Sequence, residues 1–179
     1  GSSGEPKGVP LTHKMILANT AQLLSKAWVP EGSPILCSLP IFHSLGLTFT
    51  TIMPLLYGFS MVTYPSPLEA KNLNELIEKH KCVIVLSTPT FARSMLRRAK
   101  ANTYDSVKYF VVGAEKLQKT LADEFEAKCG KKLLEGYCLT ETTPVCGVNL
   151  DEIGPTAEQP YYVPGVKMGS IGQLMPGLA

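Results

Sequence analysis

Gly136-Tyr-Cys-Leu-Thr-Glu-Thr-Thr-Pro144 follows a short apolar run and places an aromatic ring, several hydroxyls and one carboxylate close together. Such a pattern is typical of a strand that ends in a polar turn. Tyr137 can stack on a flat ring, Thr140 can hydrogen-bond a phosphate oxygen, and Glu141 can hold a hard cation such as Mg²⁺. Taken alone, a Thr-Glu-Thr-Thr run more often marks a solvated loop with a capping threonine.

A second phosphate-type signal lies in Gly1-Ser-Ser-Gly-Glu-Pro-Lys-Gly8. Small residues let backbone N–H groups approach an anion, Ser2 and Ser3 add hydroxyl donors, and Lys7 adds a positive charge. The segment is not a Walker A loop, because the spacing to Lys7 differs and no Ser or Thr follows the lysine. A leader from an expression vector is the alternative origin of the first four residues. Together the two signals favour a nucleotide site.

On these residues the chain resembles the adenylate-forming superfamily of acyl-CoA synthetases, luciferases and nonribosomal peptide adenylation domains. Residues 1–8 match the family's phosphate loop, S-G-T-T-G-x-P-K-G, from its second position. Residues 137–141 match its Y-G-x-T-E motif, with Cys138 in place of the glycine, and residues 169–177 resemble G-S-x-G-x-P-x-P-G. The resemblance implies that the protein uses ATP and Mg²⁺ to activate a carboxylic acid.

The resemblance also implies a role for each candidate residue. Lys7, Thr140 and Glu141 would act in catalysis, with Thr140 on the α-phosphate and Glu141 as the Mg²⁺ ligand. The groups that would bind the nucleotide are Ser2, Ser3 and Gly4 on the phosphates, Tyr137 on adenine, and the backbone of Gly113, Ala114 and Glu115, which also borders the acyl pocket.

His43 lies in Pro40-Ile-Phe-His-Ser-Leu-Gly46, after an apolar run. From the sequence alone, such a histidine is more often a satisfied core residue or a helix cap than a catalyst. The resemblance favours a gate or a substrate-positioning role near the acyl carboxylate. A general base is not expected, because a carboxylic acid is already ionised at pH 7.

The composition of the chain limits the classes of protein and partner to be considered. With 179 residues and 45% hydrophobic content, the chain can form one domain with a real core. A net charge of +2 with interspersed signs gives no basic stripe, so no nucleic acid partner is expected. Five cysteines without a C-x-x-C pair favour buried free thiols and a reducing cytoplasm. Pro54 and Gly58 interrupt the longest apolar run, and neither a membrane span nor a signal peptide is expected.

Short apolar runs alternate with helical patterns along the chain, which predicts an α/β fold with a parallel sheet flanked by helices. Strands are expected at 34–39, 60–64, 82–87, 108–112 and 146–150, and helices at 12–28, 49–56, 68–80, from 88 onward and at 118–129. The strand ends at His43, Gly113 and Tyr137 should face one crevice. We expect a single piece of an AMP-binding domain, with a phosphate loop at 1–9, an α/β subdomain at 10–150, and a loop with the start of a β-hairpin region at 151–179.

Residues 39–47, 87–91 and 113–117 look most like bacterial acyl-acyl carrier protein synthetases, which are often joined to 2-acylglycerophosphoethanolamine acyltransferases. That resemblance implies a fatty acid substrate, an acyl carrier protein partner, phospholipid acylation, and a cytoplasmic parent at the inner face of the membrane. Two alternatives stay open: a long-chain acyl-CoA synthetase, and a non-catalytic module that keeps the fold, for which Cys138 is the support. The family's ribose-binding aspartate and its C-terminal lysine are not found, so the piece alone is expected to be inactive.

Overall fold

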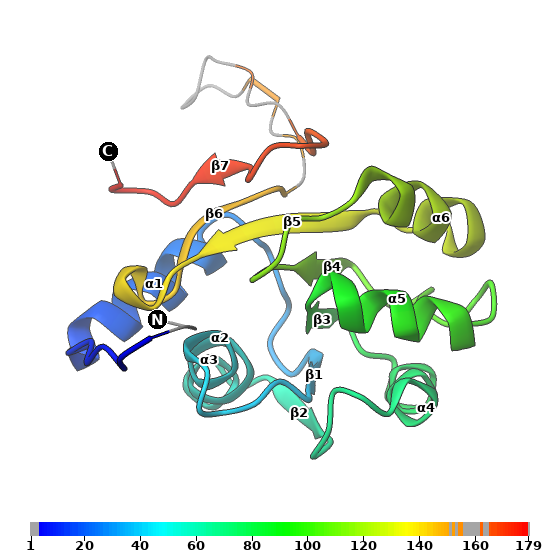
Figure 1. The fold of residues 1–179 in the computed structure, drawn as a ribbon, viewed down its shortest axis with the longest axis horizontal. Helices are drawn as coiled ribbons and strands as arrows, with labels where there is room; N and C mark the ends of the chain where they lie inside the picture. The colour runs from blue at the N-terminus through cyan, green and yellow to red at the C-terminus, as the bar shows by residue number, and fades with distance from the viewer. Residues whose placement is uncertain (1–3, 151, 153, 156–161, 163–164, 179) are drawn as a thin grey trace.

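The computed structural model describes residues 4–150, 152, 154, 155, 162 and 165–178. These residues form a seven-stranded sheet with the order β2-β1-β3-β4-β5-β6-β7 (Figure 1). The strands are β1 Pro34–Cys37, β2 Ser60–Thr63, β3 Ile84–Ser87, β4 Tyr109–Val112, β5 Leu133–Cys138, β6 Val145–Val148 and β7 Gln173–Leu174. Neighbouring strands from β2 through β1, β3 and β4 to β5 are parallel. Strand β6 pairs antiparallel with β5, and β7 pairs antiparallel with β6.

Helices connect the parallel strands. They are α1 His13–Leu24, α2 Ser44–Leu47, the π-helical η1 Thr48–Ile52, α3 Met53–Leu56, α4 Ala70–His80, α5 Pro89–Arg98, α6 Lys119–Cys129 and the 3-10 turn η2 Thr140–Thr142. The chain runs from β1 outward to β2 and then returns past β1 to β3, β4 and β5. Because parallel crossovers are right-handed, this reversal puts α2, η1 and α3 on one face and α4, α5 and α6 on the other (Figure 1).

Each face of the sheet has its own core. Leu36, Val85 and Phe110 point toward α4, α5 and α6. Their strand neighbours Ile35 and Ile84 point toward the opposite face, where α1, α2 and η1 pack. Because successive strand residues alternate between faces, the apolar runs in β1, β3 and β4 bury both sides of the sheet.

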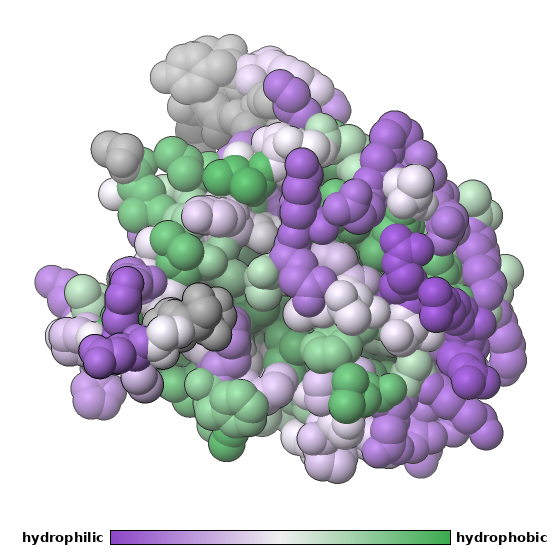
Figure 2. All heavy atoms as spheres, viewed as in Figure 1, coloured by the Kyte–Doolittle hydropathy of each residue, from purple (hydrophilic) through white to green (hydrophobic). Residues whose placement is uncertain are grey.

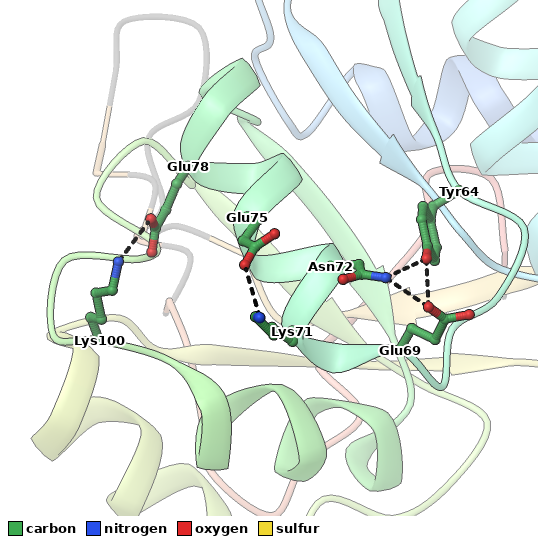
Figure 3. A network of polar contacts seen from close by, with 7 residues as sticks. All are labelled: Tyr64, Glu69, Lys71, Asn72, Glu75, Glu78 and Lys100. Atoms are coloured by element: carbon green, nitrogen blue, oxygen red, sulfur yellow. Dashed lines mark hydrogen bonds and ion pairs between the residues drawn. The ribbon is translucent and has the colours of Figure 1, made fainter.

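The outer surface differs between the two faces. Figure 2 shows hydrophilic side chains gathered over α4, α5 and α6, and larger hydrophobic areas over β6, β7 and the α2–α3 segment. Tyr64, which follows β2, donates a hydrogen bond to Glu69 (2.6 Å) and accepts one from Asn72 (2.5 Å), which ties the end of β2 to the start of α4 (Figure 3). The ion pairs Lys71–Glu75 and Glu78–Lys100 in the same view are largely solvent-exposed and add little stability.

The expected fold class is confirmed. Thr12 caps α1 through its hydroxyl, and Gly130 ends α6 with a left-handed φ of 63°. The first helix ends at Leu24, four residues before the expected Trp28, which is 71% exposed ahead of Pro30. The segment 169–177 contains β7, which extends the same sheet. The domain subdivision at residues 9 and 150 stays a prediction, and most of the Pro-rich stretch 151–162 lies outside the described residues.

All five cysteines are free thiols. Cys37, Cys82 and Cys129 are buried, as expected, but Cys138 at the end of β5 and Cys146 on β6 are only half-buried. In the part of the chain that the structure describes, no helix is both long and apolar enough to cross a bilayer.

Candidate functional site

The carboxyl ends of β1, β4 and β5 meet around a cavity of about 360 Å³, named here the lysine cavity. Its walls are Lys7 and Val9, His43 and Ser44, Ala114, and residues 138–141. Four segments far apart in sequence therefore converge where an open parallel sheet places ligands. The cavity joins Lys7, Thr140 and Glu141, the residues expected to act in catalysis, with His43, the expected positioning residue. The single crevice expected for His43, Gly113 and Tyr137 is not found in that form, because Gly113 and Tyr137 line two neighbouring cavities.

Lys7, Thr140 and Glu141 face this cavity with unused polar groups. All three are exposed, and among the described residues none of their side chains makes a hydrogen bond or an ion pair. Thr142 stabilises the turn that carries the last two: its hydroxyl accepts from the Leu139 N–H (3.2 Å) and donates to the Leu139 carbonyl (2.9 Å). A rigid turn thus presents a hydroxyl and a carboxylate opposite an ammonium group.

His43 is the N-cap of α2. Its Nδ1 accepts a hydrogen bond from the Leu45 N–H at 3.2 Å, and the ring is otherwise exposed to the lysine cavity. An accepting Nδ1 carries no proton, so the neutral ring has its proton on Nε2. Nε2–H is then available as a donor toward the cavity. Of the two structural alternatives, the helix cap is correct and the buried core histidine is wrong.

Tyr137, Ala114 and Glu115 line a second cavity of about 300 Å³, the tyrosine cavity. Tyr137 is 42% exposed at the end of β5, and the facing wall is residues 169–171. Glu115 is not free, because it accepts a hydrogen bond from the Thr90 hydroxyl at 2.6 Å. This cavity brings the predicted adenine-stacking ring beside the predicted backbone contacts and the third sequence motif.

A third, apolar cavity of about 30 Å³ lies beneath the other two. Leu23, Leu45 and Phe49 form one wall, and Gly113 and Gly136 lie on the strand side. A Cβ on Gly113 would lie 3.2 Å from the Gly136 carbonyl oxygen, a tight contact that the glycine avoids where β4 and β5 end. Gly113 thus faces the apolar cavity, while its neighbour Ala114 faces the lysine and tyrosine cavities.

Ala114 adopts a φ of +66°, a left-handed conformation that costs an ordinary residue about 1 kcal/mol. The strained residue lines both polar cavities. Such strain persists where the surrounding structure imposes it, and it concentrates at functional sites. The turn after β4 therefore directs backbone groups into the site.

Two asparagines that the sequence patterns did not single out hold the site together. Buried Asn19 of α1 donates to the Val145 carbonyl (2.7 Å) and accepts from the Val145 N–H (3.1 Å), which fixes β6 to the helix. Asn149 donates to the carbonyls of Glu135 (3.1 Å) and Ser170 (2.6 Å), which fixes the 169–171 wall. The sequence feature that could have identified Asn19 is its position on the apolar face of the helix, between Ile16 and Leu23.

Not every predicted residue joins the site. Gly4 has a left-handed φ of +88° but lines none of the three cavities. Ser2 and Ser3 lie outside the described residues. The structure gives the positions of the candidate residues, and the roles assigned to them stay predictions.

The polar groups fit a nucleotide with a divalent cation. Within the described residues no three His, Cys, Asp or Glu side chains cluster as in a protein-only metal site. Mg²⁺ commonly takes one or two carboxylates and completes its shell with substrate phosphates and water, so Glu141 alone is an adequate protein ligand. Lys7 supplies the positive charge that phosphate oxygens require.

Comparison with known proteins bears on the whole chain. The family described as AMP-binding enzyme matches residues 1–179. A long-chain-fatty-acid–CoA ligase of Bacillus subtilis (strain 168) is 38% identical over 157 residues, which cover 83% of this chain and 27% of the ligase. A 4-coumarate–CoA ligase 1 of Arabidopsis thaliana is 30% identical over 178 residues, covering 96% of this chain and 31% of that protein.

Solved structures show the same arrangement. ATP-bound MatB from Rhodopseudomonas palustris superposes with a TM-score of 0.83 at 26% identity, covering 99% of this chain and 33% of that one. The N-terminal domain of FACL13 from Mycobacterium tuberculosis superposes with a TM-score of 0.73 at 25% identity, covering 83% of this chain and 38% of that one. The chain spans about a quarter to a third of the length of the curated relatives named above.

Proposed function

Because the chain belongs to the AMP-binding enzyme family, we propose that it is the nucleotide- and acid-binding part of an acid–CoA ligase. The carboxylate oxygen of the acid would attack the α-phosphorus of ATP, forming an acyl-adenylate as the bond to pyrophosphate breaks. The sulfur of a thiol would then attack the acyl carbon and release AMP. Reactions of this kind depend mainly on positioning and on charge neutralisation.

One observation carries the proposal: Lys7 and Glu141 line one cavity without forming an ion pair. In the part of the chain that the structure describes, no ion pair within 4 Å joins the Lys7 ammonium to the Glu141 carboxylate. Phosphate oxygens beside Lys7 and a cation beside Glu141 would fill the space between them. The same pair explains why a carboxylate can stand in a site for a polyanion, because the cation offsets its repulsion.

The other candidate groups take positions that suit this reaction. Thr140 would donate its hydroxyl to the α-phosphate, and Tyr137 would stack on adenine in the tyrosine cavity. His43 would direct Nε2–H at the carboxylate of the acid. Since its Nδ1 already accepts from Leu45, His43 acts as a fixed donor and not as a base.

The apolar cavity is the proposed site of the acyl group. At about 30 Å³ it holds little more than one water molecule, so a long chain needs side chains to move. Phe49 belongs to the π-helical η1, a type of irregularity that often occurs at functional sites, and Leu45 belongs to the adjacent α2. These residues would open the cavity. The name of the Bacillus subtilis relative supports a long-chain fatty acid.

Coenzyme A is the proposed thiol acceptor. Both curated relatives named above are CoA ligases, whereas neither name mentions the acyl carrier protein or the phospholipid acylation expected from the sequence. The carrier-protein acceptor therefore becomes the second candidate, supported only by the resemblance of residues 39–47, 87–91 and 113–117. A cytoplasmic location at the inner membrane face rests on that same candidate.

The test is acid-dependent exchange of labelled pyrophosphate into ATP, measured on the protein that contains this chain. Palmitate, 4-coumarate and acetate are the separate substrates, and the second step is followed by thioester formation with coenzyme A or with acyl carrier protein. We expect exchange with palmitate and a thioester with coenzyme A. Exchange with 4-coumarate alone would overturn the acid class, and exchange with none of the acids would overturn adenylation.

A further inference from the structure

Cys138 lies where the three cavities meet. Among the described residues it alone lines the lysine, tyrosine and apolar cavities, and it alone is shared by the apolar and the lysine cavity. Any group that reaches from the apolar cavity toward Lys7 and Glu141 therefore passes the Cys138 side chain.

The thiol is the main side chain at this junction. The other residues that connect two cavities are Gly136 and Ala114, which offer no side chain and a single methyl group. Sγ lies 4.0 Å from the position of a Cβ on Gly113, so it reaches across the space that the glycines leave open. Among the described residues that these cavities share, Cys138 therefore has the largest side chain.

The thiol acts through its size. Burial raises the pKa of Cys138, and the Ala114 backbone N–H offsets this only in part, so the group is neutral at pH 7. Its backbone is held at the end of β5 opposite Val145, next to an irregularity in the β5–β6 pairing. A neutral, positioned sulfur presents a steric limit to a ligand.

We propose that Cys138 is a specificity-determining residue that limits bulk on the carbon next to the carboxyl group of the acid. This inference rests on the proposed function, because it takes the apolar cavity as the acyl site and the lysine cavity as the phosphate site. The α-carbon then lies at the junction beside Sγ. An unbranched acid passes the sulfur, whereas an α-branch collides with it.

The experiment compares palmitate with 2-methylpalmitate, which differ only at the α-carbon. Pyrophosphate exchange is measured for the unmodified protein, for Cys138→Gly and for Cys138→Ala, and kcat and KM are obtained separately. We expect the preference for palmitate in kcat/KM to fall about tenfold or more in Cys138→Gly and less in Cys138→Ala, as for other methyl-sized changes. Cys138→Ala keeps the Cβ and the conformational preference of a non-glycine backbone. It therefore tests the role of the sulfur even if the glycine variant is unstable.

Cys146→Ala is the matched control, because this half-buried neighbour on β6 lines none of the three cavities. It should leave the preference unchanged. Exchange with palmitate and an unaltered preference in both Cys138 variants would overturn the role of Cys138 and leave the proposed function standing. An absence of exchange with either acid in the unmodified protein would overturn both.

Discussion

The two faces of the sheet differ in regularity. Helices α4, α5 and α6 have 11, 10 and 11 residues, and they cover a core in which the rings of Tyr104, Phe110 and Phe125 lie 4.9 to 5.3 Å apart. The opposite face is covered by α1 and by a segment that changes from α2 to the π-helical η1 and then to α3. None of the three site cavities is lined by α4, α5 or α6.

The irregular backbone of the other face is held by local hydrogen bonds and by a close approach at one glycine. The Gly46 carbonyl accepts hydrogen bonds from the hydroxyls of Thr50 (2.8 Å) and Thr51 (3.2 Å), which stabilise the wide turn of η1. A Cβ on Gly46 would lie 2.2 Å from the Pro40 carbonyl oxygen, so α2 packs on its own entry loop only through glycine. One face therefore has regular helices over its core, and the other accepts irregular backbone to form the site.

The largest expected effect on stability is in the regular face. Phe125→Ala removes a fully buried ring from the aromatic cluster and should lower the free energy of unfolding by about 3–5 kcal/mol. Urea unfolding followed by circular dichroism measures the change. Activity per folded molecule should persist, and a selective loss of activity at unchanged stability would contradict the division between the faces.

On the face that forms the site, we expect a loss of activity without a loss of stability. Glu141→Ala removes the proposed Mg²⁺ ligand and should slow pyrophosphate exchange about 100-fold or more, as with other groups that stabilise charge in a transition state. The urea midpoint should stay within error, because Glu141 is exposed and has no partner among the described residues. Glu126→Ala, an exposed carboxylate on α6, is the control and should keep full activity. Full turnover of Glu141→Ala would refute the metal assignment.

A smaller effect is expected where stability and site geometry meet. Asn19→Ala leaves the Val145 N–H and carbonyl without their side-chain partners and should cost about 1–3 kcal/mol. Since Val145 lines the apolar cavity, KM for the acid should rise as well. Exposed Asn102→Ala serves as the comparison and should change neither value. A loss of stability with an unchanged KM would show that β6 keeps its position without Asn19.

The smallest effect is shared by both faces and depends on pH. Burial, and then nearby Cys82, raises the pKa of Cys37 to about 12, and burial raises that of Cys82 to about 11. Both thiols are protonated in the folded and unfolded states below pH 9, the ordinary cysteine value. Above it only the unfolded chain releases the protons, so stability should fall from pH 9 toward pH 11–12. Urea midpoints between pH 8 and pH 10 test this, and Cys37→Ala should flatten the slope.

Local patterns were sufficient for the fold class and for most of the strands and helices, but not for the irregular segment from α2 to α3. Alternating apolar runs and helical periodicity predict the α/β class, because each element buries its own apolar side chains. Thr12 and Gly130 mark helix ends through their own hydrogen bonding and backbone freedom. Lys7, Thr140 and Glu141 were singled out by their chemistry together with the family resemblance, and their roles stay predictions.

Only the tertiary structure decided which of these groups meet. The antiparallel addition of β6 and β7 depends on strand order. The contact of Asn19 with Val145 joins residues more than a hundred positions apart, and the junction at Cys138 joins segments equally distant. Hydrophobic periodicity carries no information about such distant pairs, since many strand orders bury the same residues. A cavity is the space that a particular order leaves between strand ends, and so it exists only in the assembled fold.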